Sequence, residues 1–204
     1  MRKLILIIVS ILFTSLLTNA ASSTTQARKT LDKAANKVAL SKGASAQFTI
    51  SGNSFGKQSG TIAVKGNKFN ARTDKAIVWY DGKTQWLYNK KNDEVNISTP
   101  SATQQQTMNP YHVLSLYKKG YNMTLSNTAN GYQVHLTAQS KNGRNIKEMY
   151  ILIDKQYNLK QVKMKQKEQW ITITVSALKQ QQFSDNSFRF NAKDYPKAEI
   201  IDLR

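Results

Sequence analysis

The chain has 204 residues, with 30 Lys and Arg against 12 Asp and Glu, a formal net charge of +18, and no cysteine. This length suits one domain or two small ones, and 40% hydrophobic residues are enough for a core, which excludes a wholly disordered chain. The lack of cysteine excludes disulfides, zinc–thiolate sites, iron–sulfur clusters and thiol nucleophiles, and two histidines leave little for a His-rich metal site.

The first 20 residues have the pattern of a secretory signal. Met1-Arg2-Lys3 is positively charged, Leu4 to Leu17 is an apolar run, and small residues surround Ala20. The run is shorter than the ~20 residues that a bilayer span needs, so a cleaved signal is favoured over an uncleaved anchor. We therefore expect residues 1–20 to be removed and residues 21–204 to form one exported domain.

An amphipathic helix is predicted directly after this segment. Capping-type residues occupy Ser22 to Thr25, and Gln26 to Lys42 follow with apolar residues three or four apart, before Gly43. That stripe consists of Ala27, Leu31, Ala34, Ala35 and Val38. Its small alanines indicate a helix that lies over a surface without filling a deep core.

Beyond Gly43 the apolar period changes to two, which predicts strands. Phe48 and Ile50, Ile62 and Val64, and Phe69 and Ala71 each alternate with polar residues. Asp81-Gly82 marks a tight hairpin. Further strands are predicted at 76–80, 84–88, 94–98, 121–126, 132–138, 146–153, 159–166 and 169–178. Ten or eleven short strands in this spacing indicate an antiparallel sheet that curls.

The exception is Thr107 to Gly120, which predicts a second helix. Asn109-Pro110 fits its start, and Tyr111 and Leu114 lie on one face, with Val113 and Tyr117 as further candidates.

The predicted strands have one apolar and one polar face. In 169–178, Ile171, Ile173, Val175 and Ala177 alternate with Thr172, Thr174 and Ser176. In 146–154, Met149, Ile151 and Ile153 share a face with Lys147. An apolar face must be covered, and only two helices are available to cover it. The pattern leaves open a tightly closed core and a hydrophobic hollow.

No catalytic arrangement is recognisable. His112 and His135 have no Ser/Asp pattern around them, and Glu148, Asp154 and Glu168 are scattered acids on a Lys-rich sheet. No Gly-rich phosphate loop or calcium loop is present. We expect a protein that is not an enzyme and uses no cofactor or metal.

The positive charge has three readings. It can be an ordinary solvated sheet face, it can attract anionic lipid headgroups, or it can bind nucleic acid. An export signal and the lack of a recognition motif argue against nucleic acid.

Several segments, in order along the chain, resemble the periplasmic outer-membrane lipoprotein carrier family (LolA-type). The most specific is V-W-Y-D-G-K-T-Q-W-L-Y-N at Val78–Asn89. Weaker matches are F-T-I at Phe48–Ile50, G-T-I-A-V-K at Gly60–Lys65, F-N-A-R at Phe69–Arg72, N-P-Y at Asn109–Tyr111, F-x-F at Phe188–Phe190 and P-x-x-x-E-I-I-D-L-R at Pro196–Arg204.

The resemblance implies an open, strongly curved antiparallel β-barrel, lidded by helices that enclose a hydrophobic cavity. It implies a periplasmic carrier that acts as a chaperone. This carrier takes lipoproteins by their acyl chains from an inner-membrane ABC-type exporter. The carrier releases them to an outer-membrane acceptor or to the membrane itself. It is expected to be a monomer that binds no nucleic acid.

By position, Phe69 matches the family's aromatic residue near the barrel mouth, and Tyr111 and Leu114 match the lid helix. With the strand phase, the predicted acyl-chain site comprises Phe48, Ile50, Ile62, Val64, Phe69, Tyr111, Leu114, Met149, Ile151, Ile171 and Ile173. Gly66-Asn67 replace an Arg-Pro pair whose Arg holds the family's lid shut, which implies a looser lid unless Arg72 substitutes.

Two other functions remain open. One is a binding module of the same fold for another lipid or amphiphile, which would bind apolar ligands without transferring lipoproteins. The other is a basic envelope protein that coats anionic polymer, which would bind polyanions in a salt-dependent way and take up no apolar probe.

Overall fold

The computed structural model describes residues 23–37, 43–54, 56–101, 104–105, 116–140, 145–166 and 168–204. The expected signal segment, Tyr111 and Leu114 lie outside these residues. No helix within the described part of the chain is long and apolar enough to cross a membrane.

A helix covers residues 23–37, and the remaining regular structure is almost entirely strand. The strands are β1 (Ala44–Gly52), β2 (Gly56–Lys65), β3 (Lys68–Thr73), β4 (Ala76–Tyr80), β5 (Gln85–Asn89), β6 (Glu94–Ser98), β7 (Tyr121–Thr128), β8 (Gly131–Ala138), β9 (Ile146–Asp154), β10 (Leu159–Gln166), β11 (Gln169–Gln180) and β12 (Glu199–Asp202). Two short 3-10 helices, η1 (Asp185–Phe188) and η2 (Ala192–Asp194), lie between β11 and β12.

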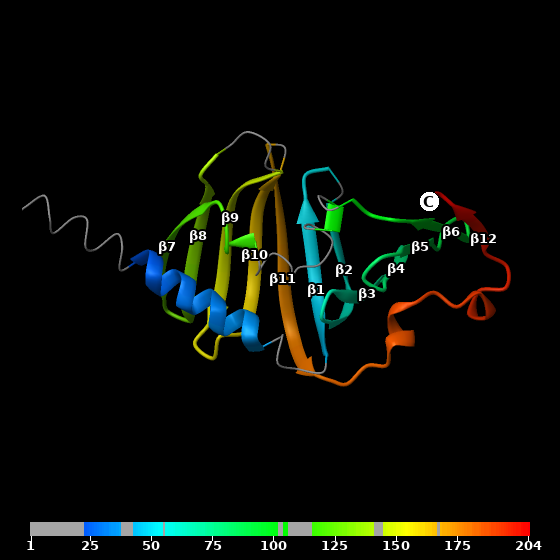
Figure 1. Cartoon of the computed structure of the whole chain (residues 1–204), viewed down its shortest axis with the longest axis horizontal. Coiled ribbons are helices and arrows are strands. Elements are labelled where there is room, and N and C mark those ends of the chain that lie inside the picture. The colour runs from blue at the N-terminus through cyan, green and yellow to red at the C-terminus, as the bar shows by residue number, and fades with distance from the viewer. Residues whose placement is uncertain are drawn as a thin grey trace, which may run out of the picture.

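These strands form one curved, open sheet (Figure 1). Its order is β12-β6-β5-β4-β3-β2-β1-β11-β10-β9-β8-β7. Neighbours pair antiparallel, except that β12 runs parallel to β6. The predicted mainly-β, antiparallel and open architecture is confirmed. The ranges 76–80, 94–98 and 159–166 are correct to the residue, whereas β12 was not predicted.

The core lies on one face of the sheet, here called the inner face. The 23–37 helix crosses this face in front of β7 to β10 (Figure 1), with Ala27, Leu31 and Ala34 fully buried in the core. Val134 and Leu136 of β8 are buried in the same core. The predicted helix thus covers this part of the sheet with a stripe of two alanines and one leucine.

The start of this helix also covers an open edge of the sheet. The side chain of Thr24 donates a hydrogen bond to the carbonyl of Met123 (3.1 Å), and the Ser23 hydroxyl accepts one from the backbone N–H of Leu125 (3.2 Å). Both backbone groups belong to β7, the last strand of the sheet. Two hydroxyls therefore satisfy polar groups that an edge strand would otherwise expose.

Two irregularities change the predicted strand faces. The β1–β11 register shifts between Ser45 and Gln47, and opposite this shift Ala177 has a φ of 48°. Ala177 is therefore exposed, and Leu178 packs against the core instead. The predicted inner position of Ala177 is wrong because a β-bulge inserts one residue and moves the later residues of the strand to the other face.

The second irregularity lies in β9. The β9–β10 register shifts between Lys165 and Gln166, so Ile146 joins the buried core. Lys147, which the alternation placed beside Met149, instead extends its Nζ to Glu168 at 2.5 Å. The predicted face of Lys147 is wrong for the same reason.

A second apolar layer covers the outer face at β4 to β6. Ile77, Trp79, Val95 and Phe188 are buried but do not belong to the inner core. Residues 181–198, here called the C-terminal strap, cross this face before β12 pairs with β6 (Figure 1).

Candidate functional site on the inner face of the sheet

All nine described residues of the predicted acyl-chain site belong to the inner core or pack against it. Six are buried in it: Ile62, Val64, Phe69, Met149, Ile151 and Ile173. Phe48, Ile50 and Ile171 are only partly buried. Their role in binding acyl chains stays a prediction.

The register explains why these positions meet. Phe48 pairs with Val175 and Ile50 with Ile173 across β1 and β11, while Val64 pairs with Phe69 across β2 and β3. Residues directly opposite in a sheet point to the same face. The alternation seen in the sequence therefore becomes one continuous apolar surface.

This surface is covered unevenly. Met149 and Ile151 lie in β9, beneath the 23–37 helix, and are fully buried (Figure 1). In β1, β3, β4 and β11 the inner face keeps apolar side chains that are only partly buried. We call this set the inner patch: Phe48, Ile50, Ala71, Val78 and Ile171. The inner patch is where an apolar ligand would find accessible surface.

Phe69 lies deeper than a residue at a cavity mouth. Its side chain is 2% exposed, and its ring centroid is 5.6 Å from that of Tyr80. The Tyr80 hydroxyl donates to the carbonyl of Gly82 (2.9 Å), and burial raises the pKa of this hydroxyl. Phe69 is thus a packed core residue in this structure.

A hollow of about 610 Å³ borders the inner patch. Gln58, Ala76 and Leu87 line it, together with Asp74, Asn89 and three lysines, Lys75, Lys90 and Lys91. Gln58 pairs directly with Ile50, and Leu87 with Val78. The hollow therefore lies on the inner face at the Ile50 end of the inner patch, and its volume is typical of a small-molecule pocket.

The rim of this hollow is basic. Lys75, Lys90 and Lys91 are exposed, and Asp74 is the acid beside them. Lys90 Nζ donates to the carbonyl of Thr73 at 2.7 Å, which fixes one of these ammonium groups at the rim. Such a rim suits a negatively charged group next to an apolar chain.

The helix is held over the sheet by contacts that do not involve Arg72. The Tyr117 hydroxyl donates to Asp32 on the helix. Burial of Tyr117 and its hydrogen bond to Asp32 both raise the pKa of that hydroxyl well above its ordinary value. The sequence offered Tyr117 only as a further candidate for the apolar face of the second helix. Nothing in the sequence pattern pointed to Asp32 as its partner.

The other end of the helix is tied to the β9–β10 turn. Lys33 Nζ donates to the Tyr157 hydroxyl (3.2 Å), and Lys37 Nζ donates to the Asn158 side chain (3.1 Å). Arg72, named as a substitute latch, lies on the outer face instead: it follows the inward-facing Ala71, and its guanidinium lies 5.8 Å from the Trp79 ring centroid. It does not reach the helix from there.

The outer face of the other half of the sheet carries a row of rings. His135 stacks on Tyr150 with centroids 4.3 Å apart, and Tyr150 is 5.9 Å from Trp170. Lys163 Nζ lies 4.8 Å from the Trp170 centroid. We call these four residues the outer row. Glu148 accepts from both His135 Nε2 and the Tyr150 hydroxyl.

These contacts argue against catalysis by His135. Its ring is engaged by Glu148 and Tyr150, and the hydrogen bonds from Tyr150 and from His135 lower the pKa of Glu148 despite its partial desolvation. No group of three or more His, Asp or Glu side chains within the described ranges could hold a metal ion. That the protein is not an enzyme stays a prediction.

A family model described as outer membrane lipoprotein carrier protein LolA matches residues 17–169. An uncharacterized conserved protein from Thermus thermophilus superposes with a TM-score of 0.56 and 14% identity, over 87% of this chain and 99% of its own. No curated protein matches.

Two further solved structures are similar over most of the chain. A DUF1329 family protein from Desulfovibrio piger has a TM-score of 0.49 at 14% identity, covering 83% of this chain and 98% of its own. A LolA superfamily protein from Nitrosomonas europaea has a TM-score of 0.45 at 8% identity, covering 80% and 97%.

Proposed function

The chain belongs to the family of the outer membrane lipoprotein carrier protein LolA, and on this premise we propose that it binds the acyl chains of lipoproteins on its inner face. It accepts them from an ABC-type exporter at the inner membrane, crosses the periplasm and releases them at the outer membrane. Residues 1–20 direct its export.

The inner patch is the observation that supports this proposal. Five apolar side chains from four strands face the same side and are left partly buried by the described core. Each methylene group removed from water contributes about 0.8 kcal/mol, so even part of an acyl chain gains several kcal/mol there. Water alone does not release such a chain, but a bilayer, which solvates it equally well, does.

The methionines of the inner face suit cargo of varied shape. Met123, Met149 and Met164 are all buried in the inner core. Unbranched, polarisable side chains repack more easily than β-branched ones. A small shift of the 23–37 helix, whose buried residues include Ala27 and Ala34, would let this core adapt.

The test is the release of lipoproteins from spheroplasts. Purified mature protein is incubated with spheroplasts, and newly made lipoproteins are measured in the soluble fraction. An Ile50→Glu variant places a charge in the inner patch. Thr49→Glu is the matched control, since Thr49 is the neighbouring residue on the outer face, where its hydroxyl contacts Ser59.

Release by the wild type and by Thr49→Glu, with loss in Ile50→Glu, is the expected result. No release by the wild type, with the exporter shown to be active, would disprove the carrier function. Phe69→Glu is a poorer probe, because a charge at a residue that is 2% exposed would unfold the core and abolish any function.

The basic rim supports a second candidate, a binding protein for an anionic amphiphile. Lys75, Lys90 and Lys91 surround the 610 Å³ hollow next to the inner patch. A fatty acid would place its carboxylate at these ammonium groups and its chain over Leu87. Calorimetry with a fatty acid and with the alcohol of the same chain length separates the two functions. If the wild type binds the acid more tightly than the alcohol, and the double variant Lys90→Gln/Lys91→Gln loses this preference, the result favours this candidate. Equal binding of the acid and the alcohol excludes it.

A further inference from the structure

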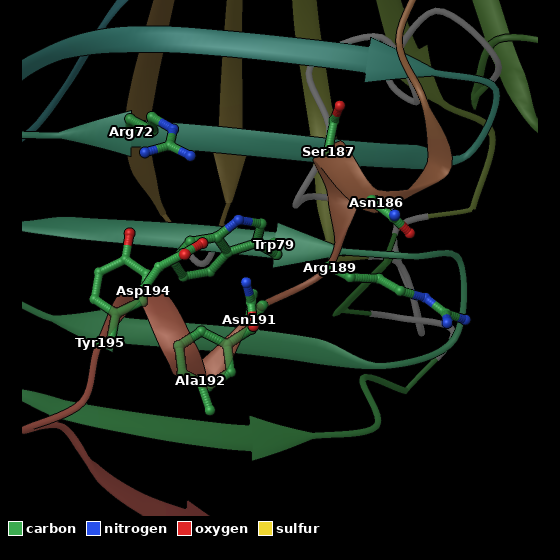
Figure 2. A pocket seen from close by; sticks show the side chains of 10 residues that line it. Arg72, Trp79, Asn186, Ser187, Arg189, Asn191, Ala192, Asp194 and Tyr195 are labelled. Carbon is green, nitrogen blue, oxygen red and sulfur yellow. The ribbon is translucent and has the colours of Figure 1, made fainter.

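A second hollow lies on the opposite side of the sheet, beneath the C-terminal strap (Figure 2). It has a volume of about 500 Å³, and its walls come from β3, β4 and the strap. Arg72, Trp79, Ser187, Asn191, Asp194 and Tyr195 are among the residues that line it. An adjoining hollow of about 350 Å³ shares Arg72 and Ser187 with it. Arg72 therefore borders both.

A buried amide holds the Arg72 side chain in place. Asn70 is only 7% exposed, and its Nδ2 donates to the carbonyl of Val78 at 3.2 Å. This bond turns its Oδ1 toward Arg72, whose Nε donates to it at 2.8 Å. Burying an amide is costly unless both its ends are bonded, and here they are. Asn70 thus acts as a positioning residue for the guanidinium.

The remaining contacts of Arg72 leave its outer edge available. Its guanidinium lies over the ring of Trp79, at 5.8 Å from the centroid. With Nε bonded to Asn70, the two terminal nitrogens are the ones left to bind a ligand. Figure 2 shows them directed toward the space above Trp79 and Tyr195, with the Tyr195 hydroxyl turned toward Arg72.

The charges around the hollow leave Arg72 without an ion-pair partner. It forms no ion pair with any carboxylate of the described residues. The hollow's other arginine, Arg189, lies 3.2 Å from Asp81 and points away from the hollow in Figure 2. Asp194 also lines the hollow, so it lowers the local positive potential without pairing with Arg72.

We propose that this hollow binds a ligand through a carboxylate or phosphate group held by the terminal nitrogens of Arg72. A guanidinium presents two parallel N–H donors, which match two oxygens of either group. The Tyr195 hydroxyl and the Asn191 amide provide further hydrogen bonds, while Phe190 and Tyr195 offer apolar wall to the rest of the ligand. The site is on the outer face, separate from the inner patch, so both can be occupied at once.

The test uses ¹⁵N-labelled full-length mature protein and two probes. Inorganic phosphate represents a phosphate ligand. N-acetyltyrosine represents a carboxylate ligand, and its uncharged amide is the comparison. The NMR signals of Arg72 Nε–H and Trp79 Nε1–H are followed during each titration, with sodium chloride added to a matched ionic strength as the blank. We expect a saturable shift of both signals with at least one of the two anions, and none with the amide.

Three variants distinguish binding by Arg72 from a general charge effect. Arg72→Gln should weaken binding at least tenfold. Lys193→Gln removes one positive charge from an exposed part of the same strap and should change the affinity less than twofold. Asp194→Asn should strengthen binding severalfold, because it removes the negative charge that lines the hollow.

Binding of phosphate alone or of N-acetyltyrosine alone would support the site and assign its oxygen group. The absence of a saturable shift with both probes, or equal affinity in Arg72→Gln and the wild type, would overturn the proposal. If Arg72→Gln does not fold, Arg72→Lys replaces it: lysine keeps the charge but lacks the two parallel donors, and unchanged affinity would overturn the proposal as well.

Discussion

Trp79 and Tyr80 are neighbours in β4, yet they are buried on opposite sides of the sheet. Trp79, 3% exposed, packs edge-on against Tyr195 of the strap at 5.6 Å between ring centroids. Tyr80, 4% exposed, packs against Phe69 in the inner core. This part of the sheet is therefore covered on both faces, and the C-terminal strap belongs to the folded domain.

The helix contributes to stability through its fully buried leucine. Leu31→Ala should lower the free energy of unfolding by about 2 to 5 kcal/mol, since it removes a buried side chain and leaves a cavity. Leu203 is 63% exposed, and Leu203→Ala should change it by less than about 0.5 kcal/mol. Urea unfolding followed by circular dichroism measures both. Similar effects of the two variants would contradict the packing of Leu31 in the core.

The hydrogen bond from Tyr117 to Asp32 should control how easily the helix opens. Tyr117→Phe keeps the buried ring but leaves the Asp32 carboxylate without this donor, at a cost of about 1.5 to 3 kcal/mol for a bond to a charged group. Hydrogen exchange should then quicken across residues 23–37, with little change in β9 and β10. Thr49→Val, which removes an exposed hydroxyl, is the control. Unchanged exchange in the helix would show that the bond does not hold it.

The turn after β4 should give a pH-dependent contribution to stability. Burial disfavours ionisation of Asp81, but the N–H groups of Thr84 and Lys83 and the Arg189 guanidinium outweigh it, so the pKa of Asp81 lies below its ordinary 3.8. A carboxyl with a lowered folded pKa stabilises the fold above its unfolded pKa of about 3.9 and loses this effect as the pH falls through the folded value.

The measurement compares the wild type with Asp81→Asn. Asparagine keeps a side-chain acceptor for the turn but no charge for Arg189. The difference in free energy of unfolding should be largest near pH 6, shrink below about pH 4, and vanish below the folded pKa. A difference that grows as the pH falls would refute this assignment.

Lys163 and Lys165 of β10, which pair with Tyr150 and Glu148 of β9, should direct the protein to anionic surfaces. Lys163→Gln/Lys165→Gln should weaken binding to vesicles of anionic phospholipid about tenfold, because each basic residue near such a surface contributes about 1 kcal/mol and Lys165 is partly neutralised by Glu168 at 2.8 Å. Lys193→Gln/Lys197→Gln removes the same charge from the strap. Equal losses of affinity in the two double variants would mean that only the net charge matters. Binding of the wild type should disappear at about 0.5 M salt, because salt screens these charges.

Periodicity predicted most of the sheet because strands such as β8 and β9 place a buried apolar residue at nearly every second position. It failed at Ala177 and Lys147, since a bulge depends on how two strands pair and leaves no local apolar signal. It also missed β12, whose four residues gain strand structure only by pairing with β6, about a hundred residues earlier in the chain.

The candidate site was predictable to the extent that it depends on strand phase. Phe48, Ile50 and Ile171 lie on the predicted face, and so does Phe69. How deeply each is buried was not predictable, because it depends on which strands the helix covers. Arg72 and Asn70 were predictable only to the same extent. Their spacing of two residues places both side chains on one face of a strand, but only the pairing with β4 shows that Asn70 bonds to Val78 and holds Arg72.

The position of β1 at the centre of the sheet has a consequence for the order of folding. Ser45 at its start donates a hydrogen bond to Gln181, 136 residues later, whereas β2 to β6 and β7 to β11 are each joined by short turns. Local hairpins form in microseconds, but contacts between distant segments must wait for the closure of a long loop. The two meanders should therefore form early and the β1–β11 seam late, so a chain emerging amino terminus first cannot complete its sheet until β11 and β12 have both appeared.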